Sequence, residues 1–126
     1  MTKSNGWILI VDDDEDIRDV IALVLERRGY RAVGAFDGQD ALDQLRERDG
    51  APALILLDLM MPRVNGVDFA KQLRSSTAMS QAPIVILSGD SRARETAASV
   101  GAADCLTKPI DLKDLVATVQ RFVGPH

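Results

Sequence analysis

The fold is decided by the stretch WILIVDDDEDIRDVIALVL, residues 7–25. Its first five residues form a continuous apolar run, which is typical of a parallel strand covered on both faces. After the acidic residues, apolar side chains recur at the period of about 3.6 residues that marks an amphipathic helix (Ile17, Val20, Ile21, Val24 and Leu25). The pair Gly29-Tyr30 should end this helix. A buried strand that passes through an acidic turn into a helix is the beginning of a βαβ unit.

The alternation of strand and helix patterns continues to the end of the chain. Further strands are predicted at residues 32–36, 53–57, 83–87 and 105–106, and further helices at about 39–48, 67–74, 92–100 and 112–123. Asp37 and Asp111 stand where the N-caps of the second and last helices are expected. Five strands and five helices in this order imply an α/β fold with a doubly wound parallel sheet, whose ligands bind beyond the carboxyl ends of the strands.

Composition limits the class of protein. The 126 residues, 46% hydrophobic and 27% charged, favour a single domain over 1–126, with a flexible N-terminal tail at 1–6 and a C-terminal end at 124–126. The longest apolar run, 20–25, is too short to cross a membrane, and no signal peptide is visible, so a cytoplasmic protein is expected. With 15 basic and 19 acidic residues the net charge is −4 and the arginines are scattered, so no direct binding of nucleic acid is expected.

Polar side chains follow four of the predicted strands. Asp12 and Asp13 follow the first strand, Asp58 the third, Ser88 the fourth and Lys108 the fifth. Because the strands are parallel, these side chains should converge on one shallow site at the same edge of the sheet. Clustered carboxylates repel one another, and Mg²⁺, which prefers oxygen ligands, relieves that repulsion. The residues therefore fit a hard cation together with a phosphoryl group.

The position of each side chain suggests its role. Asp58 stands alone at the end of a buried strand, where a neighbouring cation would let its carboxylate attack phosphorus. Lys108 would pair with one phosphoryl oxygen, and the hydroxyl of Ser88 would donate a hydrogen bond to another. The sequence thus predicts a phosphoryl group on Asp58 and Mg²⁺ as the cofactor.

These motifs resemble those of the receiver domain of bacterial two-component response regulators, over essentially the whole chain. They are, in order, Asp12-Asp13, Leu57-Asp58-Leu59-Met60-Met61-Pro62 with Asn65-Gly66, Ser88, and Lys108-Pro109. The resemblance, which is to single-domain receivers of the chemotaxis-regulator type, implies a flavodoxin-like fold with strand order 2-1-3-4-5. It implies that Asp13, Asp58 and the backbone carbonyl of Met60 bind Mg²⁺ directly, that Asp12 acts through water, and that the Lys108-Pro109 bond is cis.

The resemblance also implies how such a domain signals. The phosphoryl donor would be a phosphohistidine on a sensor histidine kinase or a histidine phosphotransfer protein, and the domain would catalyse only its own phosphorylation and dephosphorylation. Phosphorylation would alter binding of a downstream protein target at the surface of helix 92–100, strand 105–106 and helix 112–123. A monomer or a weak phosphorylation-dependent dimer is expected, without membrane contact. Met60 and Asp90 would flank the path of the hydrolytic water, with Asp90 holding it.

Cys105 departs from the family pattern and supports a second interpretation. It stands three residues before Lys108, where the family usually has an aromatic residue that swings inward on activation. No aromatic residue occurs between Pro83 and Pro109 that could replace it. The alternative is therefore a non-phosphorylated pseudo-receiver that acts as a docking or dimerisation module. A haloacid-dehalogenase-type phosphatase is disfavoured, because Met60 stands where its second acid is needed.

Overall fold

The chain folds into a parallel sheet of five strands in the order β2-β1-β3-β4-β5. A computed structural model describes residues 6–48, 51–58, 71, 82–89, 93–99 and 101–124. The strands are β1 (Trp7–Val11), β2 (Arg31–Ala35), β3 (Leu54–Asp58), β4 (Ile84–Ser88) and β5 (Asp104–Thr107), and every neighbouring pair is parallel. The expected doubly wound sheet and its strand order are confirmed.

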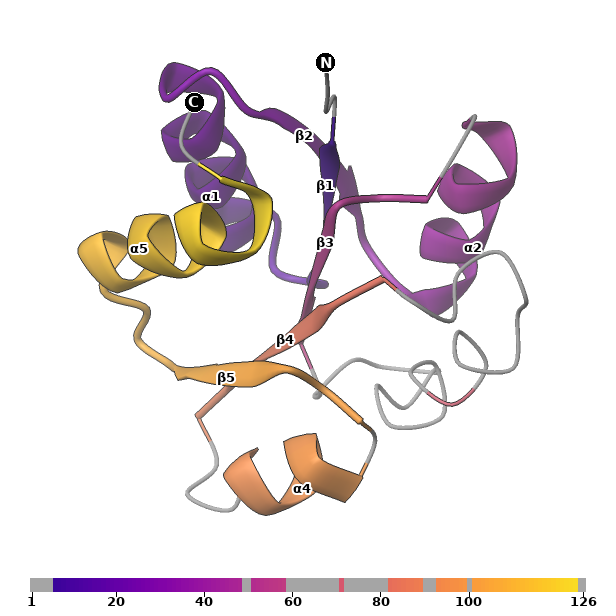
Figure 1. Cartoon of the computed structure of the whole chain (residues 1–126). Helices are drawn as coiled ribbons and strands as arrows, with labels where there is room; N and C mark the ends of the chain where they lie inside the picture. The colour runs from indigo at the N-terminus through magenta and orange to yellow at the C-terminus, as the bar shows by residue number, and fades with distance from the viewer. Residues whose placement is uncertain are drawn as a thin grey trace.

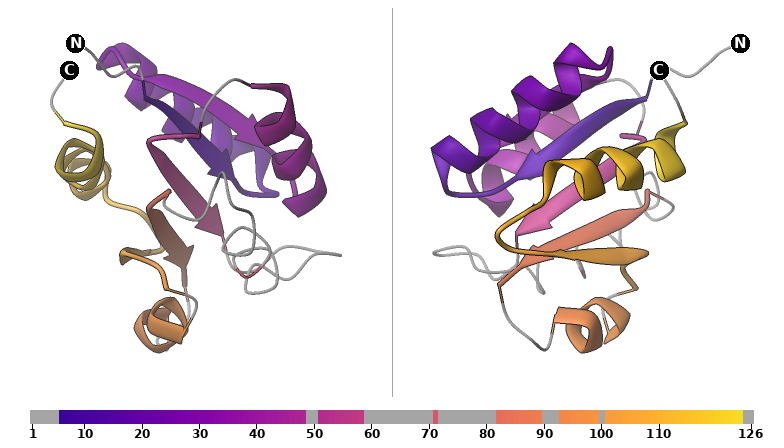
Figure 2. Two further views of the ribbon diagram at one scale, coloured as in Figure 1. Left: turned by 45° about the vertical axis from the view of Figure 1, so that its right-hand side comes forward. Right: turned by 90° about the vertical axis from the view of Figure 1, so that its left-hand side faces the viewer.

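Helices cover both faces of the sheet. Within the described residues they are α1 (Glu15–Arg27), α2 (Gly38–Glu47), α4 (Ala93–Ser99) and α5 (Leu112–Val123). Helices α1 and α5 pack on one face and α2 and α4 on the other (Figures 1 and 2). The helix predicted at 67–74, apart from Lys71, and the tail predicted at 1–6, apart from Gly6, lie outside the described residues. None of the helices in the described part of the chain is long and apolar enough to cross a membrane.

The core consists of two apolar layers separated by the sheet. Strands β1, β3 and β4 are buried along their whole length, which explains their continuous apolar sequences. On one face, Ile21 and Leu25 of α1 pack with Leu115 and Val119 of α5. On the other face, Ala41 and Leu45 of α2 and Ala97 of α4 pack against the sheet. Three central strands are thus held from both sides, and their ends occupy fixed positions.

The observed elements differ from the prediction mainly at the strand ends. Strands β3 and β4 each run one residue beyond the apolar stretch, because Asp58 pairs with Leu87 and Ser88 pairs with Thr107. β5 has four residues instead of the two predicted, because the polar residues Asp104 and Thr107 at its ends also pair with β4. The N-caps at Asp37 and Asp111 are confirmed, since each side chain accepts hydrogen bonds from the first turn of its helix. Because β3 and β4 are longer than predicted, Asp58 and Ser88 lie on strands rather than on loops.

Tyr30 ties the turn after α1 to the end of α5. The buried Tyr30 hydroxyl donates a hydrogen bond of 2.7 Å to the backbone carbonyl of Gly124. Burial raises the pKa of Tyr30, and the nearby charge of Arg28 only partly opposes this. The folded protein therefore favours the neutral phenol, which keeps the hydrogen bond to α5.

Replacing Tyr30 by phenylalanine should lower the free energy of unfolding by about 1 kcal/mol at neutral pH, because one buried hydrogen bond is lost. Since folding raises the pKa of Tyr30, its contribution is complete below the unfolded value of about 10 and is lost as the pH rises through the folded value. Urea unfolding of both proteins at about pH 7 and pH 11 measures this. The difference between them should shrink at the higher pH, and a constant difference would contradict the assignment.

Candidate functional site

Three carboxylates meet at the carboxyl ends of two neighbouring strands. Asp12 and Asp13 follow β1 and Asp58 ends β3, and each offers a carboxylate oxygen within 4.8 Å of the others. Asp12 is 0% exposed and Asp58 3% exposed, whereas Asp13 is open to solvent. The cluster thus has two buried carboxylates and one exposed carboxylate, and an ion can enter from the exposed side.

Asp12 is fixed by four hydrogen bonds. Its backbone N–H donates to the carbonyl of Ala35 at 3.1 Å, which extends the ladder between β1 and β2. Its Oδ1 accepts from the backbone N–H of Asp14 at 2.9 Å, and its Oδ2 accepts from Lys108 Nζ at 3.1 Å. Its carbonyl accepts from Arg18 Nη1 at 2.8 Å. Both oxygens of this buried carboxylate therefore have partners within the protein, which suits a residue expected to act on the ion through water.

Lys108 links the two buried carboxylates. Its Nζ lies 3.1 Å from Asp12 Oδ2 and 3.3 Å from Asp58 Oδ2. Burial by itself lowers the pKa of Lys108, but the hydrogen bonds and charges of Asp12 and Asp58 outweigh burial, so the net shift is upward. The side chain is consequently an ammonium at neutral pH. The peptide bond to Pro109 is cis, which confirms that expectation.

Ser88 lies at the same edge, on the strand between Asp58 and Lys108. It ends β4 and is buried, and its backbone carbonyl accepts a hydrogen bond of 2.9 Å from the N–H of Lys108. The structure thus brings Asp12, Asp13, Asp58, Ser88 and Lys108 together, while the roles expected of them stay predictions. Met60 and Asp90, the other expected site residues, lie outside the described residues.

Cys105 is a buried free thiol on β5. Its side chain belongs to the apolar layer under α2 and α4, together with Ala97. A polar cavity of about 360 Å³ borders it, lined among others by Arg94, Lys108 and Asp111. A small side chain therefore occupies the place where the family usually has an aromatic residue, and a cavity lies beside it.

The acidic cluster fits a magnesium ion by its donor chemistry. Mg²⁺ takes oxygen ligands at about 2.1 Å, keeps several waters and is usually bound through one or two carboxylates. All the potential ligands of the cluster are carboxylate oxygens, and none is a sulfur or a nitrogen. The exposed side at Asp13 leaves access for water. Asp13 and Asp58 are suitable direct ligands, because both oxygens of Asp12 already accept hydrogen bonds.

The sequence reasoning missed Arg18. A cation in the first turn of a helix opposes the helix dipole, so an arginine directly after an acidic turn indicates a specific acceptor nearby. In the structure that acceptor is the carbonyl of Asp12. Gly34 within β2 was a second signal, because a glycine inside a strand often marks a close approach by another group.

Many known proteins are similar to this chain in sequence or in fold. The chain matches the family model of the response regulator receiver domain over residues 8–120. The phosphate regulon transcriptional regulatory protein PhoB of Escherichia coli is 38% identical over 123 residues, which cover 94% of this chain and 53% of PhoB. The chemotaxis protein CheY4 of Vibrio cholerae has a TM-score of 0.85 at 29% identity, with 93% of this chain and 98% of that chain covered. A response regulator receiver protein from Pseudomonas putida has a TM-score of 0.86 at 30% identity, with 95% and 99% covered.

These similarities differ in how much of each relative they include. The chain spans about half the length of the curated relatives that it matches. It corresponds to nearly the whole of the two solved receiver structures. The match to the family model agrees with the observed strand order and with the acidic cluster at the sheet edge. The chain therefore belongs to the receiver domain family of two-component response regulators, whose members are regulatory signalling domains rather than turnover enzymes.

Proposed function

We propose that this chain is a phosphorylation-dependent switch that accepts a phosphoryl group on Asp58 in a Mg²⁺-dependent reaction. The donor is a phosphohistidine on a sensor histidine kinase or a histidine phosphotransfer protein, in the cytoplasm. The observation that carries the proposal is the position of the Asp58 carboxylate, 3.3 Å from Lys108 Nζ and clustered with Asp12 and Asp13. A nucleophile, a metal-binding group and a cation for the phosphoryl oxygens are then present together.

Asp58, Lys108 and Ser88 have different roles in the phosphoryl transfer. An oxygen of Asp58 forms a bond to phosphorus while the bond from phosphorus to the imidazole nitrogen breaks, and the imidazole keeps that electron pair. The other nitrogen of the phosphohistidine ring carries a proton, so the ring leaves as a neutral imidazole with one N–H. The ammonium of Lys108 turns from the carboxylates to a phosphoryl oxygen, and the Ser88 hydroxyl donates to another. Bound Mg²⁺ supplies neutralisation of the charge on the carboxylates and the phosphoryl oxygens.

The proposed output surface consists of α4, β5 and α5, where a downstream protein target binds. Ser88 lies in register with Thr107 of β5, and the Lys108 N–H is bonded to the Ser88 carbonyl. A shift of Ser88 toward the phosphate would therefore displace β5 directly. An ion pair between Asp104 and Arg121 joins β5 to α5. The proposed state is a monomer or a weak phosphorylation-dependent dimer, with no direct contact to nucleic acid or membrane.

Cys105 favours a second candidate function, a docking or dimerisation module that is not phosphorylated. The thiol cannot act as an aromatic switch, and a cavity of about 360 Å³ lies beside it. Phosphorylation is favoured instead by the acidic cluster of the site together with Ser88 and Lys108. Labelling with a small phosphodonor separates the two functions.

Asp58→Asn should abolish phosphorylation, because an amide oxygen is too weak a nucleophile for this transfer. Intact mass after incubation with acetyl phosphate and Mg²⁺ measures the adduct, which should be stable in acid and labile in base. The wild-type chain with EDTA in place of Mg²⁺ is the control and should stay unmodified. Full labelling of Asp58→Asn would refute the assignment, and absence of labelling in the wild type would support the docking module.

Asp13→Ala should weaken Mg²⁺ binding sharply, because it removes a direct ligand. Asp14→Ala is the matched control: Asp14 is the N-cap of α1, so its loss should cost about 1 kcal/mol of stability and leave Mg²⁺ binding nearly intact. Titration calorimetry with MgCl₂, together with urea unfolding of both variants, measures the two effects. Equal losses of Mg²⁺ affinity would show that the ligands of the acidic turn are assigned to the wrong residues.

Asp90→Ala should slow the loss of the phosphoryl group, because a carboxylate at this position can orient the hydrolytic water while the apolar Met60 cannot. The decay of the phosphorylated mass after removal of the phosphodonor gives the rate. Met60→Ala is the control and should leave the rate close to that of the wild type. A rate that is unchanged or faster in Asp90→Ala would count against this role of Asp90.

A further inference from the structure

Arg18 reaches from α1 to the end of β1. It is the fourth residue of the helix and is half-buried. Its Nη1 donates a hydrogen bond of 2.8 Å to the backbone carbonyl of Asp12. Its side chain therefore runs from the helix to the acidic turn and ends on the main chain rather than on a carboxylate.

Gly34 leaves the space through which this side chain passes. A Cβ atom at Gly34 would lie 2.9 Å from Cδ of Arg18 and 3.2 Å from its Cγ. Among the described residues, the glycines with a positive φ do not include Gly34. Other residue types can therefore adopt its backbone conformation. Space rather than backbone conformation thus calls for glycine here. Any larger residue at this position would push Arg18 aside.

We infer that Arg18 is a positioning residue for the metal site and that Gly34 is the residue that makes room for it. The carbonyl of Asp12 belongs to the planar peptide unit that also contains the nitrogen of Asp13. A hydrogen bond to this carbonyl therefore fixes the orientation of the peptide between the two acids, and with it the direction in which the Asp13 side chain leaves the backbone. The inference rests on the proposed function, because it concerns the residues proposed to hold Mg²⁺.

The direction in which Mg²⁺ affinity changes when Arg18 is replaced distinguishes a positioning role from an effect of its charge. Removing the guanidinium makes the surroundings of the acidic cluster more negative, and this alone would tighten Mg²⁺ binding. Loss of positioning weakens binding, because Asp13 is no longer aimed at the ion. Residues that orient metal ligands typically affect affinity by about 10- to 100-fold. Arg18→Met should therefore weaken Mg²⁺ binding, opposite to the effect of the charge.

The experiment compares Arg18→Met, Gly34→Ala and the double variant with the wild type. Phosphorylation by acetyl phosphate is followed over a range of Mg²⁺ concentrations, and Mg²⁺ binding is measured separately by calorimetry. The half-saturating Mg²⁺ concentration should rise roughly tenfold in Arg18→Met, while the rate at saturating Mg²⁺ stays within about twofold. Gly34→Ala, which keeps the charge, should shift in the same direction. The double variant should be no worse than Arg18→Met, because Gly34 acts through Arg18.

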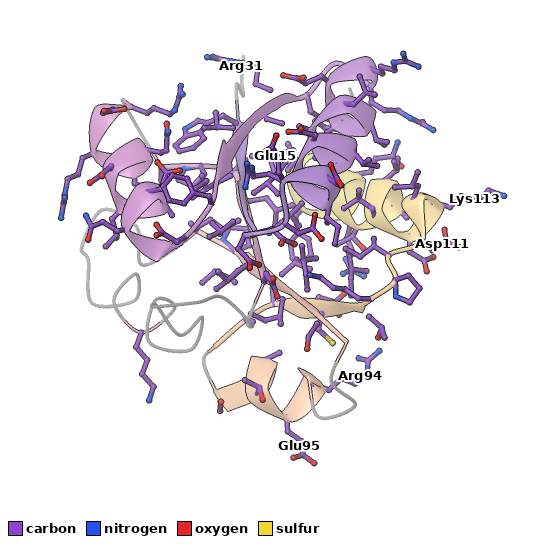
Figure 3. The ribbon with its side chains drawn as sticks, turned by 180° about the vertical axis from the view of Figure 1, so that it is seen from behind. Glu15, Arg31, Arg94, Glu95, Asp111 and Lys113 are labelled. Carbon is purple, nitrogen blue, oxygen red and sulfur yellow. The ribbon has the colours of Figure 1, made fainter. Side chains whose placement is uncertain are left out.

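Arg31→Ala is the matched control for loss of one arginine. Arg31 is exposed at the far end of β2, away from the start of α1 at Glu15 (Figure 3), and its loss should leave the Mg²⁺ dependence unchanged. An unchanged or lower half-saturating Mg²⁺ concentration in Arg18→Met would overturn the inference, whether or not the variant is less stable. Additive effects in the double variant would also overturn it. If the wild type neither binds Mg²⁺ nor becomes phosphorylated, the proposed function fails first.

Discussion

The ammonium of Lys108 contacts one carboxylate oxygen of Asp12 and one of Asp58, and these contacts offset the repulsion between two buried negative charges. Isolated charges in a protein interior cost several kcal/mol each, so the two acids depend on this cation. Lys108 in turn is placed by the sheet, since its N–H bonds to the carbonyl of Ser88. A change at any of these residues alters the electrostatic balance of the whole edge.

The geometry of the site is largely the geometry of the sheet. Asp58 and Ser88 are the last residues of β3 and β4, and both strands are buried on both faces. Apolar packing of these two strands therefore sets where the backbones of Asp58 and Ser88 lie. Asp12, at the start of the acidic turn after β1, is also held by hydrogen bonds with Arg18, Asp14 and Ala35. These contacts fix the carboxylate of Asp12 and the backbone of the acidic turn.

The sequence was sufficient to predict the order of elements and the residues gathered at the sheet edge, because buried parallel strands have continuous apolar runs and their carboxyl ends share one edge. Strand β5 was predicted too short, since its outer residues Asp104 and Thr107 are polar and pair only through the backbone. The link from Arg18 to the Asp12 carbonyl was missed. Its acceptor is a main-chain carbonyl, which no residue type marks in a sequence, so the arginine after the acidic turn and Gly34 in β2 were indirect signals.

Trp7 is the only tryptophan in the chain and opens β1, at the opposite end of the strand from the acidic turn. Its ring is buried, with the Arg48 guanidinium 5.4 Å from the ring centre. Five residues of extended strand place it about 17 Å from Asp12 along β1. Its fluorescence therefore reports exposure of the core rather than events at the carboxylates. The protein therefore carries an intrinsic fluorescent probe of unfolding at the end of the sheet opposite the acidic cluster.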